Sequence, residues 1–65
     1  MMTEDDFKYL KGKTEEEAKK DLPPRYFIFV GDRDGQAFYR TLEFNPYRIN
    51  VRVRGGYITH IDGLN

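Results

Sequence analysis

The stretch that decides the fold is Thr41-Leu42-Glu43-Phe44-Asn45-Pro46-Tyr47-Arg48-Ile49-Asn50-Val51. From residue 48 onward, apolar and polar side chains alternate, which is typical of a strand with one buried face. The expected buried face carries Ile49, Val51 and Val53, and the expected polar face carries Arg48, Asn50, Arg52 and Arg54. Residues 41–47 are polar and aromatic and contain a proline, so we expect an exposed binding loop that the polar face of the strand holds in shape.

Two more strands are expected around this one. Residues 25–30 are almost continuously apolar, which favours a strand buried on both faces or a central place in a small sheet. Gly55-Gly56 predicts a two-residue type I′ turn, because glycine readily adopts positive φ, and a third strand is then expected over residues 57–62. Residues 31–35 have the composition of a turn, and residues 36–42 fit either a strand or a loop.

A short helix is expected to begin after Thr14. Thr14 as N-cap and Glu17 at the third helical position match a capping box. Pro23-Pro24 ends the helix, because proline lacks the backbone N–H and pushes the residue before it out of helical geometry. Glutamates precede lysines by four residues, the favourable order for ion pairs along a helix. The two expected pairs are Glu15–Lys19 and Glu16–Lys20.

The length of 65 residues allows one domain, residues 1–65, with one small core. Residues 1–6 are acidic and polar, and we expect them to be disordered. Phe7 and Leu10 are the first apolar pair, and their spacing suits a short turn that lays both side chains on the core.

The inventory of side chains excludes several functions. Without cysteine, neither disulfides nor a thiolate metal site can form. Without serine, and with His60 as the one histidine, a serine or cysteine hydrolase is excluded, and we expect no enzyme and no cofactor. His60 is expected on the surface of the third strand. The segment 32–35 resembles the start of a calcium loop, but the remaining ligands are missing, which favours a tight turn and no metal.

Charge and hydropathy bear on partners and location. The net charge is zero, which argues against non-specific binding of polyanions. Residues 1–6 contain no basic region typical of a signal peptide, and no apolar run is long enough to span a membrane. We therefore expect a cytoplasmic monomer with no membrane and no nucleic-acid partner, and secretion by another route stays open.

Two separated segments resemble one family of folds. Residues 7–20, Phe7-Lys8-Tyr9-Leu10-Lys11-Gly12-Lys13-Thr14-Glu15-Glu16-Glu17-Ala18-Lys19-Lys20, resemble W-x-x-L-V-G-K-S-x-E-E-A-K-K without a gap. That pattern opens the potato inhibitor I family of serine protease inhibitors. Residues 41–51 resemble T-M-D-Y-R-P-D-R-L-N-V, a stretch of a bacterial inhibitor family with the same kind of fold. The segment Gly56-Tyr57-Ile58-Thr59-His60-Ile61 resembles G-x-I-T-R-V of that family.

The resemblance implies an α+β fold in which one short helix packs on a small mixed three-stranded sheet, with a long exposed loop between two parallel strands. It also implies inhibition by substrate mimicry, in which the loop enters a serine protease cleft as a substrate would. Leu42 then fills the primary specificity pocket, and Leu42–Glu43 is the bond presented to the nucleophile. The residues expected to contact the protease are Arg40, Thr41, Leu42, Glu43, Phe44 and Asn45. Those expected to brace the loop are Pro46, Arg48 and Asn50.

A rigid loop suits this mechanism. It loses little entropy on docking, so more of the contact energy appears as affinity. If the peptide bond is cut, the new amine stays beside the acyl-enzyme, and religation competes with hydrolysis. Arg48 offers several donors in a fixed fork that can clamp the loop, and Pro46 removes backbone freedom. A leucine at the central position suits an apolar primary pocket of subtilisin or chymotrypsin type.

The sequence departs from the family pattern. The connection from Val30 to Thr41 is several residues longer than in the plant family, and the helix is shorter. The second bracing arginine is replaced by Asn50, and the cysteines common in the bacterial family are absent. The first and third departures bear on whether the loop is rigid enough to inhibit.

Other readings stay open at this point. Leu42 also fits a strand residue packed on the core, and Arg48 also fits a solvated strand arginine with a surface ion pair to Glu43. A non-inhibitory protein-binding module on the same scaffold is the main alternative function. A small nucleic-acid-binding domain is a further one, with aromatic side chains stacking on bases beside basic ones. Its residues would be Arg48, Arg52, Arg54, Phe38, Tyr39 and Tyr47.

Overall fold

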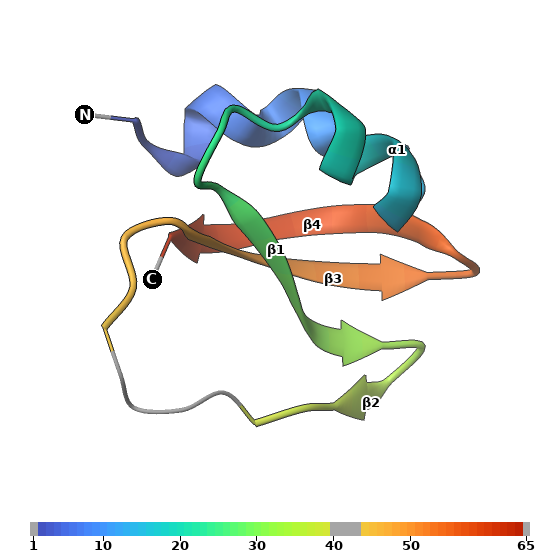
Figure 1. Ribbon diagram of the computed structural model, residues 1–65. Coiled ribbons are helices and arrows are strands. Elements are labelled where there is room, and N and C mark those ends of the chain that lie inside the picture. Colours follow the sequence, from blue (N-terminus) through green and yellow to red (C-terminus); the bar gives the residue numbers. More distant parts are fainter. Residues whose placement is uncertain (1, 40–43, 65) are drawn as a thin grey trace.

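The computed structural model describes residues 2–39 and 44–64. Two helices come first, the 3₁₀-helix η1 (Glu4–Leu10) and the α-helix α1 (Glu15–Asp21). Four strands follow, β1 (Phe27–Arg33), β2 (Gln36–Ala37), β3 (Arg48–Arg54) and β4 (Tyr57–Leu64). The strands form one sheet in the order β2-β1-β3-β4, and both helices lie on the same side of it (Figure 1).

The sheet is mixed. β1 and β3 are parallel, with Ile28 opposite Ile49 and Val30 opposite Val51, whereas β2 and β4 join as antiparallel hairpin partners. The predicted α+β class and the parallel central pair are therefore confirmed. The predicted count of three strands and one helix is wrong, because the chain forms four strands and two helices.

The additional strand, β2, forms because the turn after β1 contains only Asp34 and Gly35, whereas the sequence predicted a turn over residues 31–35. Asp34 and Gly35 have φ values of 52° and 89°, as a two-residue type I′ hairpin turn requires. Asp32 and Arg33, which were predicted to lie in the turn, belong to β1 and pair with Ala37 and Gln36. The residues that lengthen the connection after Val30 are thus partly used in a hairpin.

The predicted Gly55-Gly56 turn is confirmed. Both glycines have positive φ, at 58° and 86°, and Arg54 faces Tyr57 across the hairpin. Because β1 and β3 run in the same direction, the two hairpin turns lie at the same end of the sheet. The Asp34 carboxylate accepts a hydrogen bond of 2.7 Å from the backbone N–H of Gly55, which joins the two turns.

The helix η1 includes residues that were expected to be disordered. The backbone N–H of Thr3 donates to Asp6 Oδ2 at 2.6 Å, so a cap begins the helix ahead of Glu4. Phe7 and Leu10, one turn apart, are both fully buried, as their spacing predicted. Phe7 also contacts the ring of Tyr26, with 5.1 Å between the centroids. The apolar side of this short helix explains why the acidic first residues are held in place.

The helix α1 confirms the predicted capping box. The backbone N–H of Glu17 donates to Thr14 Oγ1 at 3.2 Å, and the backbone N–H of Thr14 donates to Glu17 Oε1 at 3.0 Å. Hydrogen bonding of its carboxylate to Thr14, first to the backbone N–H and then to the side chain, lowers the pKa of the Glu17 carboxyl, because it favours the charged form. The predicted ion pairs along the helix are not formed within residues 2–39 and 44–64: Glu15 binds Arg33 of β1 instead.

The core lies between the helices and one face of the sheet. β3 supplies its centre through the alternation seen in the sequence. The fully buried apolar side chains are Phe7, Leu10, Ala18, Ile49, Val51, Val53 and Ile58. Ile28 and Val30 of β1 are half-buried and pack against this group. Among the described residues, no helix is long and apolar enough to cross a membrane.

The capping box makes a testable contribution to stability. Thr14→Ala removes the acceptor for the Glu17 N–H, and we expect it to lower the free energy of unfolding by about 1 kcal/mol. Thr14→Ser keeps the hydroxyl and serves as the matched control, with stability close to that of the parent. Urea denaturation followed by circular dichroism measures both. Equal stability of the Ala and Ser variants would show that the cap does not stabilise the domain.

Candidate functional site

The structure places the two flanks of the predicted contact loop. Its centre, Arg40, Thr41, Leu42 and Glu43, lies outside the described residues. The predicted contact residues that are described are Phe44 and Asn45, and the predicted bracing residues are Pro46, Arg48 and Asn50. The site is therefore built from the segments on either side of residues 40–43 and from the strands beneath them.

The segment before the loop is attached to β1. The backbone N–H of Phe38 donates to Gly31 O at 2.9 Å, which continues the β1–β2 pairing by one bond. At the other end, Tyr47 O accepts a hydrogen bond of 3.0 Å from the backbone N–H of Phe27, the first residue of β1. Both ends of the connection are thus bonded to one strand, near its opposite ends.

The segment after the loop forms a turn around Pro46. Asn45 O accepts from the Arg48 backbone N–H at 3.2 Å, which closes the four-residue turn, with proline at the position that its fixed φ favours. Asn45 Oδ1 also accepts from the Tyr47 backbone N–H at 3.0 Å. Phe44 precedes this turn with 69% of its side chain exposed. A large apolar side chain is thus presented to solvent from a turn with defined hydrogen bonds.

Arg48 is buried at the start of β3. It keeps only 7% of its surface exposed, so it is not a solvated strand arginine. Its Cζ lies 6.0 Å from the centroid of the Phe29 ring, which is a cation–π distance. Phe29 stands on the neighbouring parallel strand, opposite Asn50. The guanidinium is therefore held on the face of the sheet opposite the core, between β1 and the turn that enters β3.

Asn50 is directed towards β4. Its Nδ2 donates to Gly63 O at 3.2 Å across the β3–β4 pair. Its Oδ1 is buried and accepts no hydrogen bond from the described residues. The Asn50 side chain therefore donates to β4, which lies on the side of β3 away from β1 and β2.

The polar face of β3 is partly neutralised. Arg52 binds Asp62 of β4 through two contacts of 2.9 Å, and this pairing raises the pKa of the guanidinium. Tyr47 packs edge-on against Tyr26 at 5.2 Å between centroids. His60 is exposed on β4, as the sequence predicted. Three members of the suggested nucleic-acid surface, Arg48, Tyr47 and Arg52, therefore already have partners within the domain.

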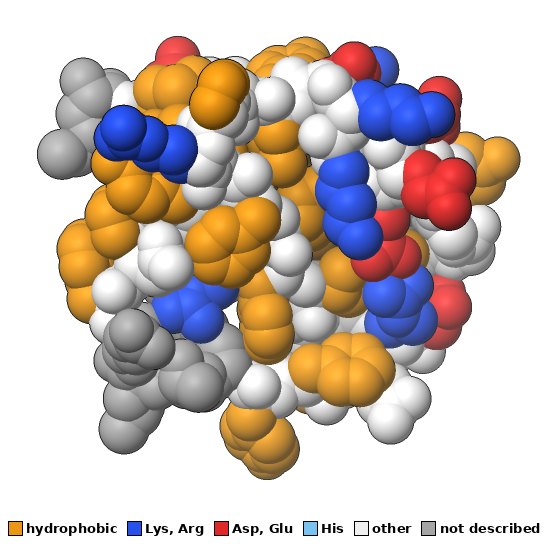
Figure 2. Space-filling view, viewed as in Figure 1, with side chains coloured by type: hydrophobic (Ala, Val, Ile, Leu, Met, Phe, Trp, Pro, Cys, Tyr) orange, Lys and Arg blue, Asp and Glu red, His pale blue; other side chains and the backbone are white. Residues whose placement is uncertain are grey.

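Exposed aromatic side chains gather where the connection leaves the sheet. Figure 2 shows hydrophobic side chains over the middle and lower part of the face, where β1, β2 and the connection to β3 lie. The exposed members on or next to these elements are Phe27, Phe38, Tyr39 and Phe44. Tyr39 is the most exposed of these four residues, at 99%.

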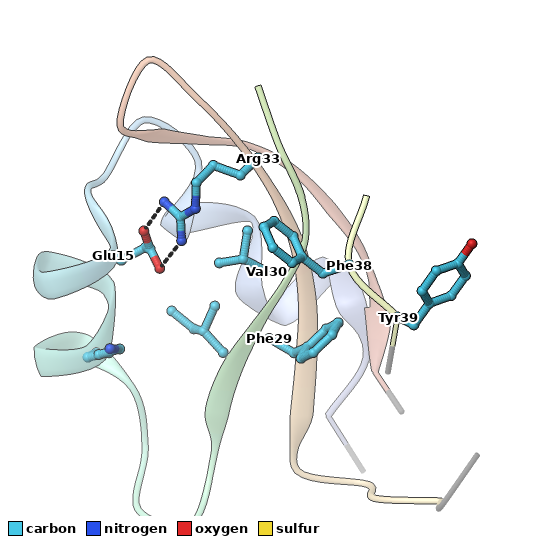
Figure 3. A pocket seen from close by; sticks show the side chains of 8 residues that line it. Glu15, Phe29, Val30, Arg33, Phe38 and Tyr39 are labelled. Carbon is cyan, nitrogen blue, oxygen red and sulfur yellow. Dashed lines mark hydrogen bonds and ion pairs between the residues drawn. The ribbon is translucent and has the colours of Figure 1, made fainter. Parts of the chain in front are cut away.

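A groove of about 390 Å³ lies beside β1. Its lining comes from α1, β1 and the segment after β2, namely Glu15, Lys19, Ile28, Phe29, Val30, Arg33, Phe38 and Tyr39. Figure 3 shows the rings of Phe29 and Phe38 over β1, whereas Tyr39 points away from the groove. This groove was not predicted, because it joins residues from three separate segments and no local pattern announces it.

An ion pair closes one end of the groove. Arg33 Nη1 and Nη2 donate to the two carboxylate oxygens of Glu15 at 2.7 and 3.0 Å (Figure 3). Hydrogen bonding to Arg33 holds the pKa of the Glu15 carboxyl below its usual value of 4.5. Both charges are half-exposed or less, and the pair joins α1 to the end of β1 while its two charges neutralise each other.

Within the part of the chain that the structure describes, no three His, Asp or Glu side chains are grouped so as to hold a metal ion. Comparison with family models, with curated proteins and with solved structures found no match. Function is therefore argued from the geometry and from the motifs of the sequence.

The Glu15–Arg33 pair gives a pH-dependent prediction. Because the folded-state pKa of Glu15 is lowered, the pair stabilises the protein above the ordinary pKa of 4.5, and this contribution disappears as the pH falls through the folded-state pKa. Arg33→Gln should therefore lower the urea midpoint at pH 7, and the difference from the parent should shrink when the pH is lowered from 7 to about 2.

Arg54→Gln is the control for that experiment, since Arg54 is an exposed β3 arginine that forms no ion pair with the described residues. It should change the midpoint little at either pH. A deficit of Arg33→Gln that stays the same at both pH values would contradict the assignment of the pair.

Proposed function

We propose that this protein inhibits serine proteases by presenting the Leu42–Glu43 bond as a substrate would. The observation that carries the proposal is the attachment of the connection at both ends. Phe38 bonds to Gly31, and Tyr47 bonds to Phe27, so the segment that contains residues 40–43 starts and ends on the same strand. The motifs shared with the potato inhibitor I family support the same function.

Fixed ends reduce the freedom of a loop, and that has two consequences for inhibition. A loop with few accessible conformations loses less entropy when it docks in a protease cleft. After cleavage, the fixed ends keep the new amine close to the acyl-enzyme, where its effective concentration greatly exceeds what free amine would reach. Both effects favour a tight complex over turnover. The type I′ hairpin over residues 33–36 contributes, because it shortens the free part of the long connection.

Arg48 is proposed to brace the loop from below. It is buried, and Phe29 limits its movement on one side. A guanidinium in a fixed position can donate several hydrogen bonds with little further loss of side-chain entropy. The position of Arg48 also agrees with the family, in which arginines on the strand after the loop support the residues beside the presented bond.

Leu42 indicates the kind of protease. An apolar primary pocket accepts leucine, whereas a trypsin-type pocket contains a carboxylate and requires a cation. The exposed Phe44, two residues after Leu42, adds an apolar contact on the leaving-group side. We therefore expect targets of subtilisin or chymotrypsin type.

A second candidate is a protein-binding module that does not inhibit. The observation that favours it is the orientation of Asn50, whose amide donates to Gly63 O of β4. If Asn50 is committed to β4, Arg48 is the main brace, and a less firmly held loop would serve binding better than inhibition. The exposed aromatic side chains Tyr39 and Phe44 suit either function.

A protease panel tests the proposal. We expect stoichiometric, saturable inhibition of a subtilisin or of chymotrypsin and no inhibition of trypsin. Mass spectrometry after long incubation should locate the first cut at Leu42–Glu43. Absence of inhibition across several apolar-pocket proteases, together with a first cut elsewhere, would rule out this function and favour the binding module.

Arg48→Ala tests the brace. Loss of the guanidinium should turn the inhibitor towards a substrate, with cleavage at Leu42–Glu43 faster by about tenfold or more, a rise that corresponds to about 1.4 kcal/mol. Arg54→Ala is the matched control, because it removes an exposed arginine from the same strand. Circular dichroism must show that both variants are folded. Equal cleavage rates in the two variants would contradict a bracing role for Arg48.

A further inference from the structure

Among the described residues, the outer edge of β1 has a strand partner only near its C-terminal end. β2 pairs only with Asp32 and Arg33, and the Phe38 N–H adds one bond to Gly31 O. Within residues 2–39 and 44–64, no strand pairs with the outer edge between Phe27 and Val30. A strand edge of this kind presents unpaired backbone donors and acceptors, which another extended chain can bond.

The backbone groups on that edge can be assigned. The Phe27 N–H donates to Tyr47 O, on the side of β3. The N–H and C=O of one strand residue point to the same side, and this side alternates from each residue to the next. Since Phe27 points to β3, Ile28 and Val30 point to the open edge. Proteins commonly protect such edges with charges, proline or a bulge. Here the segment 27–30 is apolar throughout, and the bulge comes only after Val30.

The open edge forms the floor of the groove beside β1. Glu15 and Lys19 of α1 line one side, and the segment of Phe38 and Tyr39 lines the other. The volume of about 390 Å³ falls within the usual range of ligand pockets, about 300–1,000 Å³. An extended chain that lay beside β1 would pass between α1 and the segment of Phe38.

We propose that the groove binds an extended peptide segment of another protein, which adds to the sheet as a strand beside β1. Main-chain hydrogen bonds to Ile28 and Val30 would hold the backbone, and alternate side chains would face the two walls of the groove. This site is separate from the loop proposed to enter a protease, and it does not depend on inhibition.

The lining specifies the chemistry of the peptide. The side chains of Ile28 and Val30 lie on the core side of β1, as do their partners Ile49 and Val51. Phe29 is on the opposite face, and the ring of Phe38 adds a second aromatic side chain to the lining. Arg33 and Glu15 neutralise each other in a bidentate pair, so Lys19 leaves the groove with a net positive charge. The expected ligand therefore has alternating apolar residues and one carboxylate near α1.

A synthetic peptide tests the site. The probe is acetyl-Thr-Val-Thr-Val-Glu-Val-Thr-amide, added to the isotopically labelled full chain. At saturation, hydrogen exchange of the Ile28 and Val30 amides should slow by about tenfold or more, because these amides gain partners. No slowing, or slowing only at residues outside the groove, overturns the proposal.

Two methylated peptides show whether binding uses a strand register. In each, every second backbone amide is N-methylated, and the two peptides differ in which set is blocked. A strand bonds β1 through one set only, so one peptide should bind nearly as well as the probe and the other should lose binding. Equal binding of both peptides would exclude strand addition.

Protein variants locate the contacts. Val30→Pro removes an outward N–H and should abolish binding, provided that circular dichroism shows a folded protein. If it does not fold, the methylated peptides still decide the question.

Lys19→Gln should weaken binding two- to fivefold, whereas Lys20→Gln, next to it on α1 and outside the groove, should not. A probe with Gln in place of Glu should remove that difference.

A second copy of the protein is the rival occupant of the groove, and sedimentation equilibrium of the protein alone tests it. A dimer that Val30→Pro dissociates would overturn the peptide proposal.

Discussion

The parallel pairing of β1 and β3 is the constraint on which the rest of the structure depends. Parallel neighbours cannot be joined by a tight turn, so the chain must travel back along the sheet between them. Residues 34–47 make this return, and part of them is folded into the β1–β2 hairpin. The remaining segment is bonded to β1 at Phe38 and at Tyr47. A long connection whose two ends are bonded to β1 is therefore a consequence of the topology, and both proposed binding sites involve it.

The two faces of the sheet have different tasks. One face, with Ile49, Val51 and Val53, packs on the helices and forms the core of a domain too small for a second one. The other face carries Arg48 and Phe29, which face each other across the parallel pair. Burying a guanidinium there is expensive unless its surroundings compensate. The burial of Arg48 beside Phe29 supports the proposal that this residue braces the loop.

The sequence identified those features that local chemistry controls. The capping box of Thr14 and Glu17, the turn at Gly55-Gly56 and the alternation of β3 all depend on residues close together in the chain, and each was found as predicted. The hairpin at Asp34-Gly35 carried the same kind of signal but was placed within a longer turn, because the polar Asp32 and Arg33 look like turn residues. They remain in β1 because β2 and β3 both bond to them.

By itself, the sequence determined the α+β class, the caps, the Gly-Gly hairpin and the buried face of β3, since each follows from periodicity or from the backbone preference of one or two residues. Only the tertiary structure decided that Glu15 binds Arg33 instead of Lys19, that Asn50 turns to Gly63, and that α1, β1 and Phe38 enclose a groove. Those outcomes depend on which segments the fold brings together. When a side chain has several possible partners of similar energy, it binds the one that the fold places nearest. Which partner is nearest depends on how the whole domain packs.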